Sequence, residues 1–372
     1  MAGTSTLSDR RRPGHAWPAA WFGSLLALGL AGCGGGEPAA PPAGGTAPGG
    51  AVSTTAATAK PRFLFITNSN ADWWTAVEKG MTDGGEAFGC QVEMRRNEKE
   101  VPGQIRLLED AISLPDVKGV AVSVYEASAP GIADAMRELQ KQGKLVIAID
   151  SDIAPAAADA RAAYIGTNNR EAGRAAGHAA ATIRPQGGKV CVFVGTSSAA
   201  NAIERREGFF EGAGDKFIQT EIFDDGSDKA RAASNVQTAL SKYDDVGVLL
   251  GLWSYNAPRI AEEASASPEM RKKLNVVTFD LDELAVGHLE GGRIDATICQ
   301  NPYEIGYQGV KLLKALADKD DAAVKAVLPD GKSRDTGVRV IVPSKDSPVK
   351  GENVITIEEM KTWMSGKGLK SS

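Results

Sequence analysis

Short apolar runs of strand-forming residues alternate with segments of helical periodicity from residue 63 onward. Continuous apolar runs indicate strands buried on both faces, which is typical of a parallel sheet with helices on both sides. In the first half these runs are FLFI (63–66), QVEM (91–94), GVAVSV (119–124), LVIAID (145–150) and AYIG (163–166). The intervening helical stripes are Trp73, Val77 and Met81, then Ile105, Leu108 and Ile112, then Ile132, Met136 and Leu139.

The same alternation begins again near residue 189. The second set of runs is KVCVFVG (189–195), QTEIFD (219–224), VGVLLG (246–251), LNVVTFD (274–280) and ATICQ (296–300). No linker of domain size separates the two sets. The pattern therefore predicts an α/β protein with two doubly wound parallel-sheet lobes, joined by short hinge crossovers that allow rotation. A chain of 372 residues with 42% hydrophobic content is long enough to form two cores.

The N-terminal segment has the features of a targeting signal. A basic triplet, Arg10 to Arg12, precedes an apolar stretch at 16–30 that is too short and too Gly-rich for a membrane span. The stretch ends in Leu30-Ala31-Gly32-Cys33, which resembles the bacterial lipobox, whose cysteine receives lipid. We expect a signal peptide at 1–32 and lipidation at Cys33. The alternative is an ordinary cleaved signal with an incidental cysteine.

Residues 34–60 consist mainly of Gly, Pro, Ala and Thr and cannot form a core. We therefore expect a lipid-anchored flexible linker at 33–60, which would let the folded part move relative to the membrane.

Charge and motifs exclude several classes of function. The net charge of −5 and the lack of a Lys/Arg stripe argue against a nucleic-acid partner. Neither G-x-G-x-x-G nor G-x-x-x-x-G-K-[ST] follows any expected strand, and no G-x-S-x-G is present. Three cysteines follow Cys33, namely Cys90, Cys191 and Cys299. Because they lack C-x-x-C spacing, the sequence indicates neither a metal site nor a disulfide framework. The sequence leaves open whether any of them pair. We expect no cofactor.

Polar and aromatic residues follow the expected strands at the end where ligands bind in parallel α/β sheets. They combine carboxylates, a guanidinium, amides and indoles, which together suit a polyol whose hydroxyls donate and accept while its C–H face is apolar. The candidate ligand-binding residues are Asn70, Trp73, Trp74, Ser123, Asp150, Arg205, Trp253, Asp280 and Gln300.

Residues 61–345 resemble the ribose/galactose-type periplasmic sugar-binding proteins of ABC transporters, whose type I fold is shared with LacI-type effector domains. The matching features are Asn70 with the two tryptophans, Asp150 after the fourth strand, Arg205 in ERREGF, Asp280 after VVTF and Gln300 in ATICQNPYEIGYQG. The sequence departs from the family pattern at Ser123, Ser151 and the Trp253-Ser254 pair. These departures leave open which sugar or polyol is bound.

The resemblance implies lobes at 61–165 plus 302–333 and at 166–301 plus 334–372, with GVRVIVP (337–343) at the third crossing. It implies hinge closure on a monosaccharide or polyol, which is then delivered to the permease of an ABC importer. We expect a bacterial monomer, anchored to a membrane in the periplasm or cell envelope. A sensor with the same cleft, acting on a chemoreceptor or a kinase, is the regulatory alternative. A hydrolase using Asp150 and Asp280 is the enzymatic alternative.

Each candidate also has a purely structural interpretation. Asp150 and Asp280 could cap helices, and Arg205 could pair with Glu204 or Glu207 on the surface. Trp253 could pack between the lobes, and Gln300 could make a hinge hydrogen bond.

Overall fold

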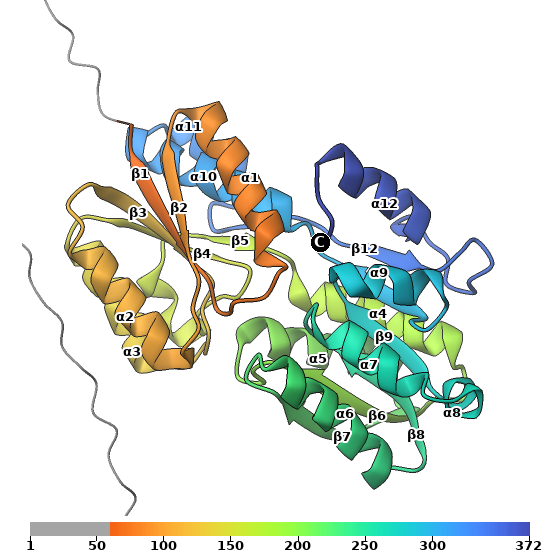
Figure 1. Ribbon diagram of the computed structural model, residues 1–372. Coiled ribbons are helices and arrows are strands. Elements are labelled where there is room, and N and C mark those ends of the chain that lie inside the picture. Colours follow the sequence, from red (N-terminus) through yellow and green to blue (C-terminus); the bar gives the residue numbers. More distant parts are fainter. Residues whose placement is uncertain (1–59) are drawn as a thin grey trace, which may run out of the picture. The chain divides into compact units, whose positions relative to one another are not determined.

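The computed structural model describes residues 60–372, all of which belong to one compact unit. The expected signal peptide, nearly all of the expected linker and Cys33 lie outside the described residues. The described part contains a six-stranded sheet, in the order β11-β5-β4-β3-β1-β2, and a seven-stranded sheet, in the order β13-β12-β10-β9-β8-β6-β7 (Figure 1).

The first lobe is built around the six-stranded sheet. Its strands are β1 (Arg62–Ile66), β2 (Gln91–Arg95), β3 (Val117–Val122), β4 (Leu145–Ile149), β5 (Tyr164–Gly166) and β11 (Ser333–Asp335). Its helices are α1 (Trp74–Phe88), α2 (Glu100–Ile112), α3 (Pro130–Lys141), η1 (Pro155–Ala160), α10 (Pro302–Asp318) and α11 (Asp321–Val327).

The second lobe is built around the seven-stranded sheet. Its strands are β6 (Gly188–Val194), β7 (Phe217–Asp224), β8 (Val246–Gly251), β9 (Asn275–Phe279), β10 (Ala296–Cys299), β12 (Arg339–Val342) and β13 (Val354–Thr356). Its helices are α4 (Asn169–Ile183), α5 (Ala200–Ala213), α6 (Lys229–Lys242), α7 (Asn256–Ala264), α8 (Pro268–Lys273), α9 (Glu283–Glu290) and α12 (Ile357–Gly366).

The expected fold class is confirmed. The orders β2-β1-β3-β4-β5 and β7-β6-β8-β9-β10 repeat one another, so the two lobes are built on the same plan. The strands within each series pair in parallel, whereas β10 and β12 pair in the antiparallel direction. All the strands expected from apolar runs are present. The apolar pattern does not predict β11 and β13, which have three residues each and no long apolar run.

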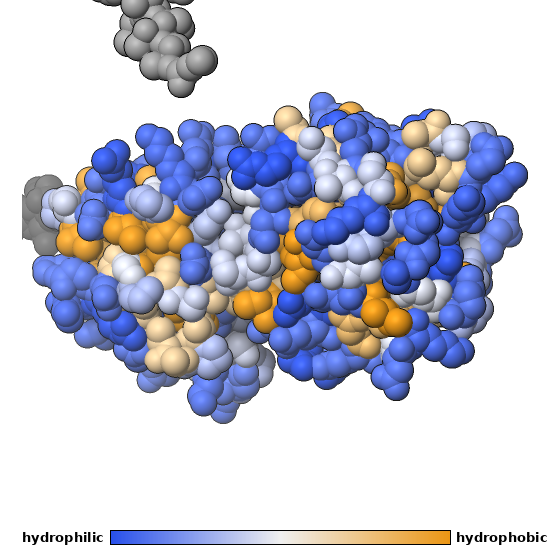
Figure 2. Space-filling view, turned by 90° about the horizontal axis from the view of Figure 1, so that it is seen from below, coloured by the Kyte–Doolittle hydropathy of each residue, from blue (hydrophilic) through white to orange (hydrophobic). Residues whose placement is uncertain are grey.

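Both faces of each sheet are buried, as continuous apolar strands require. In β1, Phe63 and Phe65 belong to one core cluster, and Leu64 and Ile66 belong to the cluster on the opposite face. Large apolar side chains that remain exposed in the described part are Ile218 and Leu284. The face seen in Figure 2 is mostly hydrophilic, with apolar residues in separate patches.

Glycines let the helices that carry the site contact one another through their backbones. A Cβ on Gly306 of α10 would lie 2.1 Å from the Val77 carbonyl oxygen of α1. In the second lobe, a Cβ on Gly173 of α4 would lie 2.3 Å from the Arg205 carbonyl oxygen of α5. These close approaches fix α1 and α5, whose first turns face the space between the lobes.

The chain passes between the sheets three times: between β5 and α4, between β10 and α10, and between β11 and β12. The third boundary expected from the sequence, 333/334, falls inside β11, because Arg334 and Asp335 continue the pairing with Ile165 and Gly166 of β5.

Candidate functional site

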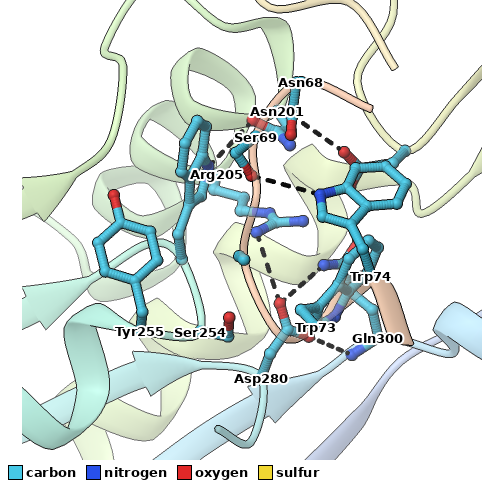
Figure 3. A pocket seen from close by; sticks show the side chains of 13 residues that line it. Asn68, Ser69, Trp73, Trp74, Asn201, Arg205, Ser254, Tyr255, Asp280 and Gln300 are labelled. Carbon is cyan, nitrogen blue, oxygen red and sulfur yellow. Dashed lines mark hydrogen bonds and ion pairs between the residues drawn. The ribbon is translucent and has the colours of Figure 1, made fainter. Parts of the chain in front are cut away.

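A cavity lies where the carboxyl ends of strands from both sheets face one another (Figure 3). It contains about 310 Å³ of empty space, counting the part that is open to solvent. Residues of both lobes line it: Asn68, Ser69, Ala71, Trp73, Trp74, Asp150, Asn201, Arg205, Trp253, Ser254, Tyr255, Asp280 and Gln300. The cavity therefore exists only where the two lobes meet.

Most of the residues selected from the sequence are brought together here, namely Trp73, Trp74, Asp150, Arg205, Trp253, Asp280 and Gln300. Ser123 lies behind the wall, where its buried hydroxyl donates a 2.7 Å hydrogen bond to Asp150 Oδ2. Asn70 is exposed, does not line this cavity, and donates to Glu98 Oε1 at 3.1 Å. In this loop the cavity is lined by Asn68 instead, two residues earlier.

Several residues of the wall were not among the sequence candidates, among them Asn68, Ser69, Asn201 and Tyr255. A signal for Asn201 was present, because it precedes Arg205 by four residues on α5 and so lies on the same helix face. The choice between Asn68 and Asn70 depends on how the loop after β1 turns, which the sequence pattern does not give.

Two carboxylates form the polar part of the cavity. Asp150 follows β4 and Asp280 follows β9, and both are about 3% exposed. Asp150 Oδ2 accepts from Ser123 and, at 3.3 Å, from Asn68 Nδ2. Asp280 accepts from the Gln300 backbone N–H at 3.0 Å and from Gln300 Nε2 at 2.9 Å. Neither is a helix cap, since the N-cap of η1 is Ala154 and that of α9 is Asp282.

Burial controls the protonation of both groups. Loss of hydration raises the pKa of Asp150, and the nearby Arg205 guanidinium opposes the increase. Loss of hydration also raises the pKa of Asp280 to about 6, again opposed by Arg205 and by the hydrogen bonds from Gln300.

Arg205 is 1% exposed, so it does not form the surface ion pair that was the alternative interpretation. Its Nε donates to Asn169 Oδ1 at 2.9 Å, and its Nη1 donates to the Leu252 carbonyl at 2.8 Å. Nη1 also lies 4.0 Å from Asp280 Oδ2. Nη2 is buried without a partner among the described residues, which leaves a charged donor available at the cavity.

The paired tryptophans stand at the start of α1 with perpendicular rings whose centroids are 5.0 Å apart. Both line the cavity. Trp74 Nε1 donates to Ser69 Oγ at 3.3 Å (Figure 3). Trp73 Nε1 is buried without a partner in the described part of the chain.

Gln300 links the hinge to the cavity. Its Oε1 accepts from Thr167 Oγ1 at 2.9 Å, and Thr167 lies on a different crossing segment. Its Nε2 donates to Asp280, as described above. Gln300 therefore makes the hinge hydrogen bond that was its structural interpretation, and it also lines the cavity.

The lobes also touch away from the crossings. The Ala127 backbone N–H donates to the Ser198 carbonyl at 3.3 Å, and Lys229 Nζ lies 3.0 Å from Asp72 Oδ2. These contacts hold the two lobes together around the cavity.

Among residues 60–372, no cluster of His, Cys, Asp and Glu has a composition that could hold a metal ion. Cys90, Cys191 and Cys299 are free and buried. No helix in the described part is both long enough and apolar enough to span a membrane.

Residues 62–321 match the periplasmic binding protein domain family. The chain belongs to this family. The resemblance inferred from the sequence is thus confirmed at the level of the family, and the hinged two-lobe architecture is the one expected of a periplasmic binding protein.

Relatives of this periplasmic binding protein include the D-allose-binding periplasmic protein of Escherichia coli strain K12. It is 24% identical over 280 residues, which cover 72% of this chain and 88% of the relative. The D-ribose/D-allose-binding protein of Pseudomonas aeruginosa is 25% identical over 280 residues, covering 69% and 83%.

Two similar solved structures are each 26% identical to this chain and superpose with a TM-score of 0.68. A glucose-galactose binding protein from Geobacillus stearothermophilus matches over 78% of this chain and 99% of its own. An ABC transporter solute binding protein from Burkholderia graminis, in complex with D-arabinose, matches over 79% of this chain and 98% of its own.

Proposed function

We propose that this periplasmic binding protein is the substrate-binding component of an ABC importer, and that it binds a monosaccharide or polyol in the interlobe cavity. The observation that carries the proposal is the cavity itself, in which two buried carboxylates and a buried guanidinium lie among three indoles. Relatives and structural neighbours named for allose, ribose, glucose-galactose and arabinose binding support the same ligand class.

The chemistry of the wall suits hydroxyl groups. Asp150 and Asp280 accept hydrogen bonds from ligand hydroxyls, and the free N–H groups of Arg205 and Trp73 donate to ligand oxygens. The indole faces of Trp73 and Trp74 pack against ring C–H groups. The charged and indole groups of the cavity are already buried, so their positions are fixed. A ligand therefore takes the place of water beside these groups.

Binding is coupled to hinge closure. Asp150 belongs to the first lobe and Asp280 and Arg205 to the second, so a ligand that contacts all three stabilises the closed arrangement. The Thr167–Gln300–Asp280 chain of hydrogen bonds connects the crossing segments to that ligand. The closed form then docks on the permease.

The proposal assigns binding and no catalysis. Asp150 Oδ2 is committed to two donors, and both oxygens of Asp280 accept from Gln300, an arrangement that suits fixed acceptors better than a general acid or a nucleophile. Incubation with aryl glycosides is expected to release no phenol. Release that disappears in Asp280→Asn would favour the hydrolase alternative.

We also propose that Cys33 carries lipid, that residues 34–60 tether the folded part, and that the protein is a monomer in the periplasm or cell envelope. The Leu30-Ala31-Gly32-Cys33 sequence supports the anchor. Expression in a bacterium with labelled palmitate tests it, because Cys33→Ala is expected to remove both the label and the membrane fraction. Equal labelling of the variant would contradict the anchor, and size-exclusion chromatography tests the monomer.

A thermal-shift screen of pentoses, hexoses, deoxy sugars, polyols and cyclitols, followed by calorimetry on the hits, tests the ligand class. A ligand at one hundred times its Kd stabilises the native state by about 2.7 kcal/mol, which is easily detected. We expect at least one neutral sugar or polyol to raise the Tm, and Asp280→Asn to reduce the shift. A response confined to charged solutes such as amino acids would contradict the proposal.

A further inference from the structure

The wall of the cavity formed by Trp253 and Tyr255 has its hydrogen-bonding groups already occupied. Trp253 Nε1 donates to Asn201 Oδ1 at 3.3 Å. The Tyr255 hydroxyl donates to Asp225, which does not line the cavity. Both residues are less than a tenth exposed, so the protein partners of these groups are not replaced by water. What these two residues present to a ligand is therefore ring surface.

The position of the Trp253 ring is fixed by its neighbours. A Cβ on Gly195, just after β6, would lie 2.1 Å from Trp253 Cζ3, so the ring packs directly over that backbone. The Tyr255 ring meets it at 73° with centroids 6.4 Å apart. Because the indole is held on one side by Gly195, on another by Tyr255 and at Nε1 by Asn201, it cannot turn its N–H toward a ligand.

Elsewhere in the cavity, hydrogen-bonding groups remain available to a ligand. Arg205 Nη2 and Trp73 Nε1 are buried donors without protein partners in the described part of the chain, and Asp150 and Asp280 are acceptors. The lining of the cavity therefore offers free polar groups at one part and, at Trp253, an indole without a free N–H at another.

We propose that Trp253 is a specificity-determining residue, which selects sugars that carry no hydroxyl on the edge facing it. The substrate class is then a pentose or a deoxyhexose rather than a fully hydroxylated hexose. This inference rests on the proposed sugar-binding function and deepens it. A hydroxyl pressed against the Trp253 ring loses its hydration without gaining a partner from that ring, a loss that corresponds to about tenfold or more in affinity.

The test compares sugars that differ in one group, using calorimetry on the full chain. The pairs are D-galactose with D-fucose, its deoxy counterpart, and D-glucose with D-xylose, which lacks the hydroxymethyl group. In at least one pair we expect the smaller sugar to bind about tenfold or more tightly. Binding that is equal in both pairs, or tighter for the hexoses, would overturn the inference while leaving sugar binding intact. If none of these four sugars binds, the inference fails; the proposed function fails only if the wider thermal-shift screen also finds no ligand.

Variants of Trp253 test whether this residue causes the preference for the smaller sugar. Trp253→Asn introduces a hydrogen-bonding side chain and extra room, and is expected to reduce the preference or reverse it. Trp253→Leu keeps the wall apolar and is expected to weaken both members of a pair while keeping their ratio. Trp363→Leu is the matched control, because Trp363 packs against Arg339 and does not line the cavity.

Two outcomes separate the effect of the wall from other causes. Ser254 also lines the cavity, and its hydroxyl is a hydrogen-bonding group beside the Trp253 ring. A ratio that changes with Ser254→Ala but not with Trp253→Asn would overturn the assignment to Trp253. Should Trp253→Asn fail to fold, the ratio in Trp253→Leu decides, because loss of the preference there contradicts selection by an apolar wall.

Discussion

Asp150 and Asp280 occupy equivalent positions in the two lobes and share an uncommon backbone conformation. Asp150 directly follows β4 with a φ of 58°, and Asp280 directly follows β9 with a φ of 61°. In the repeated strand order, β4 and β9 are corresponding strands. Residues other than glycine rarely adopt a positive φ, and such conformations are concentrated at functional sites. The two lobes thus present one carboxylate each to the same cavity by the same local geometry.

Asp280→Asn should weaken sugar binding by about 2 to 3 kcal/mol, or roughly 30-fold to 150-fold. The amide keeps the shape of the side chain but cannot accept from both Gln300 donors and from a ligand hydroxyl as well. Calorimetry measures the change. Asp159→Asn is the control, because Asp159 is 65% exposed and pairs with Arg137 outside the cavity. Equal affinities for the two variants would remove Asp280 from the site.

Affinity should fall as the pH drops through about 6. Burial raises the pKa of Asp280 to about 6, so below that pH the carboxylate takes up a proton and loses acceptor capacity. Titrations at pH 5 and pH 7.5, conditions chosen on either side of this pKa, measure the effect. In Asp280→Asn the pH dependence should be reduced. A wild-type Kd that is constant across this range would contradict the assignment.

The free energy of unfolding without ligand should respond to pH in the opposite direction. Because the pKa of Asp280 is about 6 in the native state and near 3.8 in the unfolded chain, the native state binds more protons between these values. The contribution of Asp280 to stability is therefore present below about pH 4 and is lost as the pH rises through 6. Asp225, whose pKa burial also raises to about 6, acts in the same window. Denaturant unfolding of wild type and Asp280→Asn isolates Asp280: the variant should gain stability relative to wild type as the pH rises.

Indole fluorescence should report ligand binding through the cavity tryptophans. Trp73, Trp74 and Trp253 line the cavity, so displacement of water and hinge closure change their surroundings. We expect an emission change with the same midpoint as calorimetry. Trp363→Phe should keep the change, because Trp363 lies against Arg339 with the guanidinium carbon 5.0 Å from its ring centre. If Trp363→Phe abolished the change instead, the signal would come from outside the cavity.

The sequence predicted the fold and the strand-end residues because both follow from periodicity. A residue directly after a buried strand, such as Asp150 or Asp280, reaches the carboxyl edge of the sheet whatever the details of the loop. The position of Asn70, in contrast, depends on how the loop between β1 and α1 turns. That loop places Asn68 at the cavity instead. Asn201 was overlooked although Arg205 on the same helix face was chosen. Periodicity locates elements, whereas the conformation of each loop is set by tertiary contacts.

Gly306→Ala should lower both stability and ligand affinity. The added Cβ would lie 2.1 Å from the Val77 carbonyl oxygen and 2.7 Å from the Met81 backbone nitrogen, so α1 and α10 must separate. Overpacking of this kind costs about 1 to 3 kcal/mol. Because α1 begins at Trp74, its displacement also moves the indole pair at the cavity.

Gly287→Ala is the matched control for Gly306→Ala. Gly287 lies inside α9 with open space around its Cβ position, and alanine there should stabilise by about 0.5 to 1 kcal/mol. Thermal unfolding and calorimetry measure both effects. An increase in the Tm of Gly306→Ala would show that backbone contact between α1 and α10 does not hold the site in place.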